Sequence, residues 1–331
     1  MRRLSPVALS CLGAGVFLLV LAPLLAWYVT PLAEVTPLDI DETSMVSGTG
    51  DYFDLERGAV QHHQKITVTR HIRGNVAAGS DDTAVWDMST TIDTPRTLKL
   101  GDPRRSFSWT VERWVSDRHT AEPVHCCGES TTSKNGQLMG GQYEGEGYLK
   151  FPFHVQPRSY RWWDASLQGA YSLHYAGSAE VNGYPGLKFT GRIPPTKIDS
   201  RFVPGALVGM PRTPQVKADV YYGNTDIEYV VDQRTGRLLS VKSSPRQTLR
   251  RPGATTDALV LLAVPDGLTM GPADQAANVA DARRDNTRLR LLGTTVPVTA
   301  AAAGLLLAAV GALRLARPSG RGRRQEATAA A

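Results

Sequence analysis

The most unusual group of reactive residues in this sequence is His125-Cys126-Cys127-Gly128. In an oxidising compartment two cysteines are expected to pair, and here each has its own neighbour as the available partner. Consecutive Cα atoms lie about 3.8 Å apart. This is less than the usual span of a disulfide, so the bond requires a distorted turn. We predict a vicinal disulfide between Cys126 and Cys127, with unpaired or intermolecular cysteines, or a redox or metal role, as the alternatives.

The other reactive residues form no catalytic or metal-binding motif. The seven histidines include no H-x-x-x-H or HExxH arrangement, and the chain contains no G-x-S-x-G, P-loop or G-x-G-x-x-G sequence. Glu144, Glu146 and Asp164 lie near aromatic residues and could form a glycosidase pair, but the sequence supplies no geometry for it. We therefore expect that the protein is not an enzyme and that it uses no cofactor.

Aromatic residues concentrate between Tyr148 and Asp164, in YLKFPFHVQPRSYRWWD. Packing between two layers of a β structure would explain them, because aromatic side chains in strands usually fill such a core. The alternative is a ligand site. For that alternative we expect an apolar lipid cavity whose wall includes Phe151, Phe153, Trp162 and Trp163.

The elements that hold these residues begin with two apolar ends. The charge-free runs 7–29 and 291–313 are each long enough to cross a bilayer as a helix of 1.5 Å rise per residue. A cleaved signal peptide is the alternative for the first run. Two membrane helices would place residues 1–6 and the basic tail 314–331 in the cytoplasm and residues 30–272 outside the cell membrane.

The distribution of charge agrees with this anchoring. The chain of 331 residues carries a net charge of +6, and seven arginines near the two ends, together with Glu326, account for all of that excess. Because the segment between the runs is neutral overall, we expect no nucleic-acid partner. A juxtamembrane helix predicted over 273–290 carries Arg283, Arg284, Arg288 and Arg290, which are placed to contact anionic lipid headgroups.

Small residues recur at four-residue spacing in both apolar runs. Ser10 precedes Ala14, Cys11 precedes Gly15, and Gly304 precedes Ala308. Such spacing lets two helices approach closely in a membrane, although it also arises by chance in Ala-rich helices.

The segment between the membrane helices is patterned as short strands. Alternation of apolar and polar residues predicts strands at 65–72, 83–92, 107–115, 216–222 and 227–231. Glu228 to Val241 predicts a hairpin, since Asp232 can accept backbone N–H bonds and Gly236 supplies a positive φ at the turn. We therefore predict a mainly β protein, an antiparallel β-sandwich or open barrel flanked by N- and C-terminal transmembrane helices.

Three phrases of the sequence stand out together: GYLKFPF at 147–153 followed by Tyr160 and Trp163-Asp164, GSAEVNG at 177–183, and Asp285-Asn286 leading to Leu291-Leu292 and Pro297. With these phrases the chain resembles the actinobacterial PorA family over almost its whole length. The resemblance implies a cell-envelope membrane protein without established catalytic residues, and the family's name implies a porin. Two Ala- and Leu-rich spans without polar faces do not supply the lining that a pore requires, so the pore is disfavoured.

These observations predict an envelope membrane protein whose extracytoplasmic β module binds or handles envelope lipid. A structural or partner-binding protein of the envelope is the main alternative, and a pore and an enzyme are the others. The expected partners are membrane lipids, with other envelope proteins as the second class. A lipid binder predicts a deep apolar cavity, whereas a partner-binding protein predicts a filled core and an exposed patch.

Overall fold

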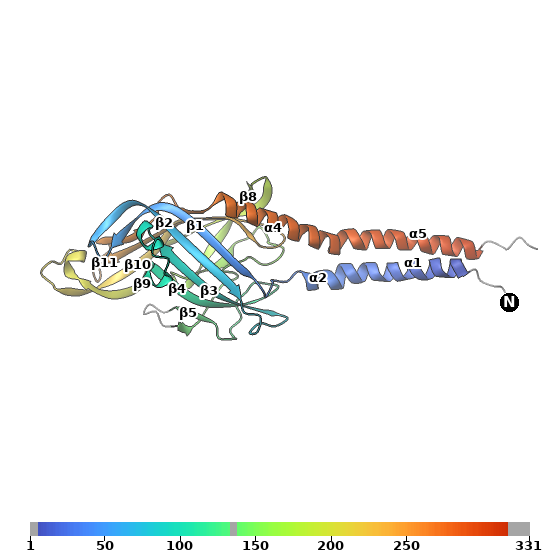
Figure 1. Ribbon diagram of the computed structural model, residues 1–331, viewed down its shortest axis with the longest axis horizontal. Coiled ribbons are helices and arrows are strands. Elements are labelled where there is room, and N and C mark those ends of the chain that lie inside the picture. Colours follow the sequence, from blue (N-terminus) through green and yellow to red (C-terminus); the bar gives the residue numbers. More distant parts are fainter. Residues whose placement is uncertain (1–5, 133–137, 317–331) are drawn as a thin grey trace, which may run out of the picture. The chain divides into compact units, whose positions relative to one another are not determined.

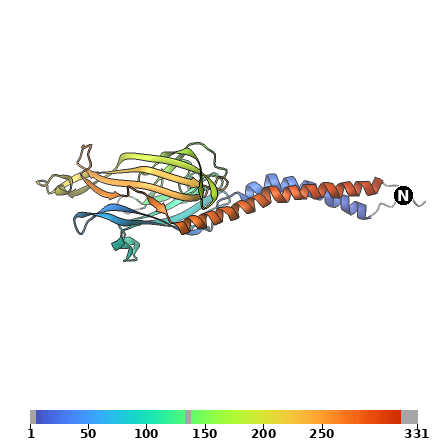
Figure 2. The ribbon, with the colours of Figure 1, turned by 90° about the horizontal axis from the view of Figure 1, so that it is seen from above.

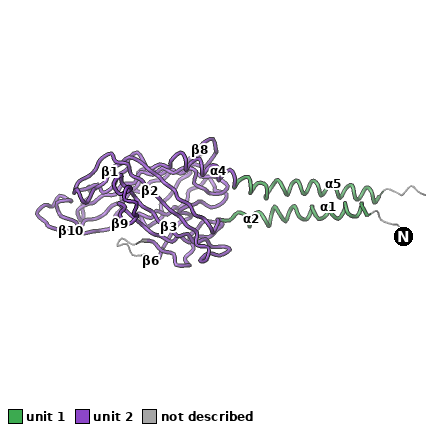
Figure 3. Tube along the Cα trace, viewed as in Figure 1, with its two compact units in different colours: residues 1–35, 285–331 green, residues 36–284 purple. Residues whose placement is uncertain are grey.

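The computed structural model describes residues 6–132 and 138–316, and the chain divides into two compact units (Figure 3). The first unit comprises residues 1–35 and 285–331, and the second comprises residues 36–284. Residues 1–5 and all but three residues of the predicted basic tail lie outside the described part of the chain, together with their arginines.

The first unit is built from the apolar ends of the chain. Helix α1 (Pro6–Leu24) continues through a π-helical turn (Leu25–Val29) into α2 (Thr30–Ala33). Helix α4 (Pro272–Arg290) continues through a second π-helical turn (Leu291–Thr295) into α5 (Val296–Ala316), so the predicted juxtamembrane helix runs into the second span. Both helices are long and apolar enough to cross a bilayer, and the chain fits a two-span membrane protein.

Helices α1 and α5 lie side by side and antiparallel in this unit (Figures 1 and 2). The buried residues of α1 are Ala8, Gly15 and Ala22, and those of α5 are Pro297, Gly304 and Gly311. Each set repeats every seven residues and consists mainly of small residues, which allows the two backbones to touch. Gly15, Gly304 and Ala308 of the predicted small-residue pairs lie in this contact, whereas Ser10 and Ala14 are exposed.

The second unit is a β domain, and its alternating sequence explains its strands. The predicted strands coincide with parts of β2, β3, β4 and β10, except that β4 begins one residue later than predicted, at Ser108. The last two predicted strands belong to one long strand, β10. The strands are β1 (Asp41–Asp54), β2 (Ala59–Gly74), β3 (Thr83–Asp93), β4 (Ser108–Asp117), β5 (Ser130–Thr132), β6 (Leu138–Gly140), β7 (Tyr160–Asp164), β8 (Gly169–Val181), β9 (Tyr184–Pro204), β10 (Gln215–Val231), β11 (Leu238–Arg250), β12 (Leu259–Ala263) and β13 (Leu268–Met270).

These strands form one 13-stranded antiparallel sheet in the order β6-β5-β4-β3-β2-β1-β12-β11-β10-β9-β8-β7, with β13 paired to β1 and β11. Most neighbours are consecutive hairpins. The exception joins the two halves of the domain, because β1 pairs with β12 and with β13, as in the register Val46 to Met270.

The sheet folds over into two layers. In Figure 2 the blue and cyan strands β1 to β4 form one layer, and the green to orange strands β8 to β11 form the other. Residues 141–147, the closing segment, connect the two edges: Gly141 N donates to Glu129 O (3.1 Å), Glu146 N donates to Arg161 O (2.7 Å) and Trp163 N donates to Gly147 O (3.0 Å). The prediction of a mainly β protein flanked by apolar helices is confirmed.

Two aromatic-rich clusters fill the space between the layers. One surrounds Phe151, Trp162 and Phe189 on the side of β7 to β10. The other brings Trp86 and Trp114 from the first layer against side chains from β7 and the segment before it. A separate cluster lies on the outside of the sheet, where Val279 and Ala282 of α4 pack against β10 and β11.

Candidate functional site

The predicted disulfide lies in the loop between β4 and β5, where the sulfurs of Cys126 and Cys127 are bonded. The loop turns sharply, since Cys126 N donates to Val124 O (2.9 Å) and Glu129 N donates to Cys126 O (3.0 Å). Cys127 and Gly128 both have positive φ, at 58° and 73°. Glycine adopts this conformation freely whereas cysteine does not. The loop therefore presents an exposed Cys127 on a tightly constrained backbone.

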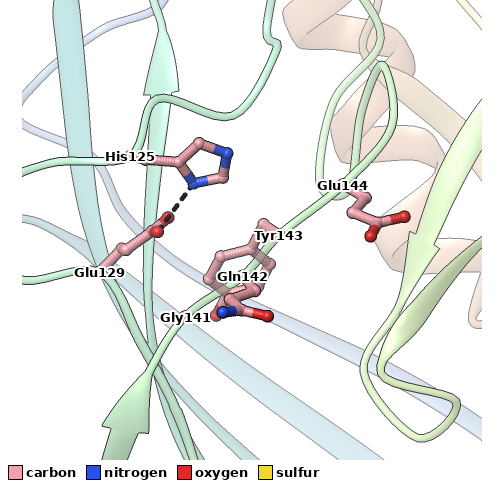
Figure 4. Close-up of a pocket in the computed structure, with 6 residues that line it drawn as sticks. All are labelled: His125, Glu129, Gly141, Gln142, Tyr143 and Glu144. Carbon is pink, nitrogen blue, oxygen red and sulfur yellow. Dashed lines mark hydrogen bonds and ion pairs between the residues drawn. The ribbon is translucent and has the colours of Figure 1, made fainter.

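A polar pocket of about 440 Å³ lies beside this loop (Figure 4). His125 Nδ1 lies 2.8 Å from Glu129 Oε1 at one side of the pocket. Tyr143, whose hydroxyl donates to Ser130 O (2.9 Å), forms part of the wall. The lining residues are His125, Glu129, Gly141, Gln142, Tyr143 and Glu144.

One oxygen of the lining residue Glu129 has no protein partner. Glu129 Oε2 is buried and receives no hydrogen bond within the described part of the chain. A buried carboxylate oxygen without a donor is costly unless a water molecule satisfies it. Among the residues that the structure describes, no group of three His, Cys, Asp or Glu could hold a metal ion.

A second polar group lies inside the β domain, between the two layers. Arg70 of β2 lies over the ring of Tyr148, 5.3 Å from its centroid. Glu112 of β4 accepts hydrogen bonds from the Tyr148 hydroxyl (2.9 Å) and from Thr131 (3.2 Å). Asp164, at the end of β7, accepts from the Tyr222 hydroxyl (3.0 Å). We name Arg70, Glu112, Tyr148, Asp164 and Tyr222 the interior polar cluster.

Burial changes the titration of this cluster. Removal from water raises the pKa of both Glu112 and Asp164, since it disfavours the ionised carboxylate. The Arg70 guanidinium is the main cause that opposes the rise in the pKa of Glu112, whereas hydrogen bonds from Leu167 N and the Tyr222 hydroxyl oppose the rise in the pKa of Asp164 more than Arg70 does. The two carboxylates, together with the tyrosines, in turn raise the pKa of Arg70 despite its own desolvation. The half-buried Arg70 thus favours the ionised form of Glu112 and, more weakly, of Asp164, and it forms no ion pair with either among the described residues.

Arg70 makes one side-chain hydrogen bond among the described residues. Its Nε donates to the Thr90 hydroxyl (3.3 Å), and the residue as a whole is half-buried.

The sequence contained a signal for this cluster that our prediction missed. Ile66, Val68, Arg70 and Ile72 share one face of a strictly alternating strand, so a charged residue occupies an inward position. A charged residue such as Arg70, on the inward apolar face of a strand, needs a hydrogen-bonding or oppositely charged partner inside the fold.

Comparison with known proteins identifies the family. The family model described as Porin PorA matches residues 7–313, nearly the whole chain. The chain belongs to the PorA family. No curated protein matches it.

In this PorA-family chain, the aromatic residues predicted to line a lipid cavity pack against one another. Phe151 stacks on Trp162 with ring centroids 4.4 Å apart, and Trp163 lies edge-on to Tyr143 at 5.1 Å. Phe151, Trp162 and Trp163 are at most 4% exposed. Phe153 is half-buried, with the ammonium of Lys150 3.8 Å above its ring. This packing gives no support to the lipid cavity, which stays a prediction.

Lys150, directly before Phe151, is a further residue that sequence reasoning missed. Its ammonium donates to Phe151 O (3.1 Å). Desolvation, with the nearby Arg237, lowers the pKa of Lys150 to about 7. The residue therefore changes charge near neutral pH, unlike an exposed lysine.

The four arginines predicted to contact lipid headgroups are exposed on α4. Arg283 contacts the β domain, where its guanidinium lies 5.7 Å from the Tyr184 ring centroid and bonds to Asn182 O (3.4 Å). Arg284 pairs with Asp281 one turn earlier. Arg288 and Arg290 follow in the last turn of α4. The contact of the four arginines with lipid headgroups stays a prediction.

Proposed function

We propose that this chain is a non-enzymatic binding module of the cell envelope. In this proposal both termini are cytoplasmic, the α1 and α5 helices anchor the chain in the cell membrane, and the β domain lies outside it. The β domain then meets its partners, which are envelope lipids or other envelope proteins, through its outer surface rather than through an interior cavity.

The observation that carries this proposal is the packing of the inward side chains. The rings of Phe151, Trp162 and Phe189 contact one another inside the domain, with centroids 4.4 Å and 4.9 Å from the Phe151 ring. A domain that accepts a lipid chain needs an apolar hollow at such positions. A domain with packed aromatic residues at these positions would bind its partners through its outer surface.

Reporter fusions test the topology on which the proposal depends. Reporters at both termini should give a cytoplasmic signal, and a reporter inserted after Gly128, in the exposed disulfide loop, should give an external one. An insertion after the exposed Gly183 of the β8–β9 turn serves as a matched control. A cytoplasmic signal from both β-domain positions would overturn the proposal.

Extraction of the purified chain with organic solvent tests whether lipid binds inside the β domain. We expect no lipid bound in a fixed ratio to the protein once the detergent-exchanged chain is extracted and analysed by mass spectrometry. A stoichiometric lipid that the Trp163→Ala variant loses would replace the proposal with lipid transport or storage inside the domain.

The family description favours a pore as the second candidate function. A pore needs a water-filled path, and the close contact between α1 and α5 leaves none between those two helices. We expect no stepwise conductance when the purified chain is added to a planar lipid bilayer. Reproducible conductance steps that the Gly15→Leu variant alters would establish the pore instead.

A further inference from the structure

A surface of exposed leucines and cations lies at one end of the β domain. The turn between β1 and β2 meets the segment between β3 and β4 there, because Arg96 of the short helix α3 (Pro95–Leu98) pairs with Glu56 and lies 3.8 Å from Asp54. In Figure 2 the teal part of this segment projects from the domain. We name it the leucine–arginine patch; it comprises Leu55, Arg57, Arg96, Leu98, Lys99, Leu100, Arg104 and Arg105.

The leucines of the patch face solvent. Leu55 is 83% exposed, Leu98 is 51% exposed and Leu100 is 42% exposed. Single exposed leucines are common on protein surfaces, but here three lie within two segments that contact each other through Arg96. Such a surface is stabilised when a partner covers it.

Three unpaired cations lie among these leucines. The five basic residues of the patch are exposed, and the same segments carry four carboxylates, Asp54, Glu56, Asp93 and Asp102. Arg57 and Arg96 pair with Asp54 and Glu56. Asp54 and Asp93 are 8% and 6% exposed, and their oxygens accept bonds from Glu56 N (2.9 Å) and the Thr97 hydroxyl (2.9 Å). Lys99, Arg104 and Arg105 have no ion pair within the described chain and are available to an anion.

The local backbone holds the leucines in place. Thr94 and Thr97 form a capping box at the start of α3, and Asp102 accepts a hydrogen bond from Arg104 N (3.0 Å) at the following 3-10 turn. The segment is thus ordered before any partner arrives, which lowers the entropic cost of binding.

We propose that the leucine–arginine patch docks onto an anionic lipid layer, with the leucines entering the headgroup region and the cations contacting phosphate groups. Leucines interleaved with unpaired cations suit an interface that is apolar below and anionic above. A soluble polyanion would use the cations and leave the leucines in water. This inference rests on the proposed function, since it gives the outer surface of the module a lipid partner.

Co-flotation of the full chain with vesicles tests the patch. The chain is held in nanodiscs of phosphatidylcholine and mixed with vesicles of phosphatidylcholine, with or without phosphatidylglycerol. Binding should require phosphatidylglycerol. The triple variant Lys99→Glu, Arg104→Glu, Arg105→Glu should bind about a hundredfold more weakly, and Leu98→Ser with Leu100→Ser about tenfold more weakly.

Matched controls change the same chemistry elsewhere on the β domain. Lys65→Glu, Arg192→Glu and Lys217→Glu alter the net charge equally at exposed positions, and Phe202→Ser removes an apolar side chain that is 67% exposed. Both controls should bind like the unmodified chain. Equal losses in the controls, or full binding by the leucine variant, would overturn the inference, the latter because the leucines would then not enter the lipid layer. The two experiments fail separately. Loss of vesicle binding would overturn the lipid-docking inference and not the proposed topology, whereas an inverted reporter topology would overturn the proposed function and not the measured vesicle binding.

Discussion

Gly15 of α1 and Gly304 of α5 face each other so closely that a Cβ atom on Gly15 would lie 2.7 Å from the carbonyl oxygen of Gly304. Leucine at position 15 therefore cannot fit without moving the helices apart. We expect Gly15→Leu to destabilise the helix pair by about 2 kcal/mol. The half-buried thiol of Cys11 should then react faster with N-ethylmaleimide in detergent.

Gly13 provides the matched control for this change. It lies half a turn away on the same helix, and a Cβ atom there would meet no atom within 4 Å. Gly13→Leu should leave the rate of Cys11 alkylation unchanged. Equal acceleration by both variants would show that the helices do not pair through Gly15.

Lys150 should make the stability of the β domain depend on pH. In the unfolded chain it titrates near 10.5, and in the folded domain its pKa is about 7. Between these values the unfolded state binds more protons, so the free energy of unfolding should rise as pH rises from about 7 toward 10.5. Lys150→Met should remove this rise, as measured by urea unfolding followed by tryptophan fluorescence. The exposed Lys65→Met serves as the control, and an unchanged slope in Lys150→Met would contradict the prediction.

Arg70 should be coupled energetically to Glu112. Removing the cation in Arg70→Met leaves desolvated carboxylates beside it and should cost about 3 kcal/mol of stability. Glu112→Gln removes one of those charges while keeping an acceptor for Tyr148. The double variant should therefore be more stable than the sum of the single effects by about 1 kcal/mol. Simple additivity in urea unfolding would mean that the two groups do not interact.

Trp163 tests whether the interior is filled. It is 4% exposed and packs against Tyr143, so Trp163→Ala should cost about 3–5 kcal/mol. Trp109, on the outer side of β4 and 42% exposed, provides a control for which we expect a change below about 0.5 kcal/mol. A small loss for Trp163→Ala in thermal unfolding would favour a hollow interior instead.

Gly236 holds the β10–β11 turn against the segment that carries Phe151. Its φ is 72°, and a Cβ atom there would lie 2.1 Å from Phe151 O. Gly236→Ala should thus cost about 3 kcal/mol or more through both strain and overlap. Gly253 has φ 73° with no neighbour within 4 Å, so Gly253→Ala isolates the backbone strain at about 1 kcal/mol. Similar losses in both variants, measured by urea unfolding, would refute the close contact.

Local patterns predicted the elements of this fold well. Alternation identified the strand around Ile66 to Ile72, and the hairpin turn has the predicted form, with Asp232 accepting from Thr235 N (2.8 Å) and Gly236 at positive φ. These features depend on a few neighbouring residues, so a single sequence carries them. Charge-free length likewise identified the two apolar helices.

Arrangements that depend on distant residues could not be predicted in the same way. Alternation has the same period whether an inward ring packs or lines a cavity, so it could not decide the surroundings of Trp162. Nor could it reveal that Tyr148 and Glu112, 36 residues apart, share a hydrogen bond. The leucine–arginine patch was missed because its two segments are far apart in sequence. They meet only in the fold, where Arg96 pairs with Glu56.

The pairing of β1 with β13 has a consequence for the order of events during synthesis. Val46 and Met270 are register partners, so the sheet cannot be completed until the chain has emerged as far as residue 270. Helix α5 follows within about 30 residues. The N-terminal hairpins must therefore wait with an unpaired edge for most of translation, and such edges are prone to aggregate. A chaperone that shields β1 until β13 has been made would be needed most by this part of the chain.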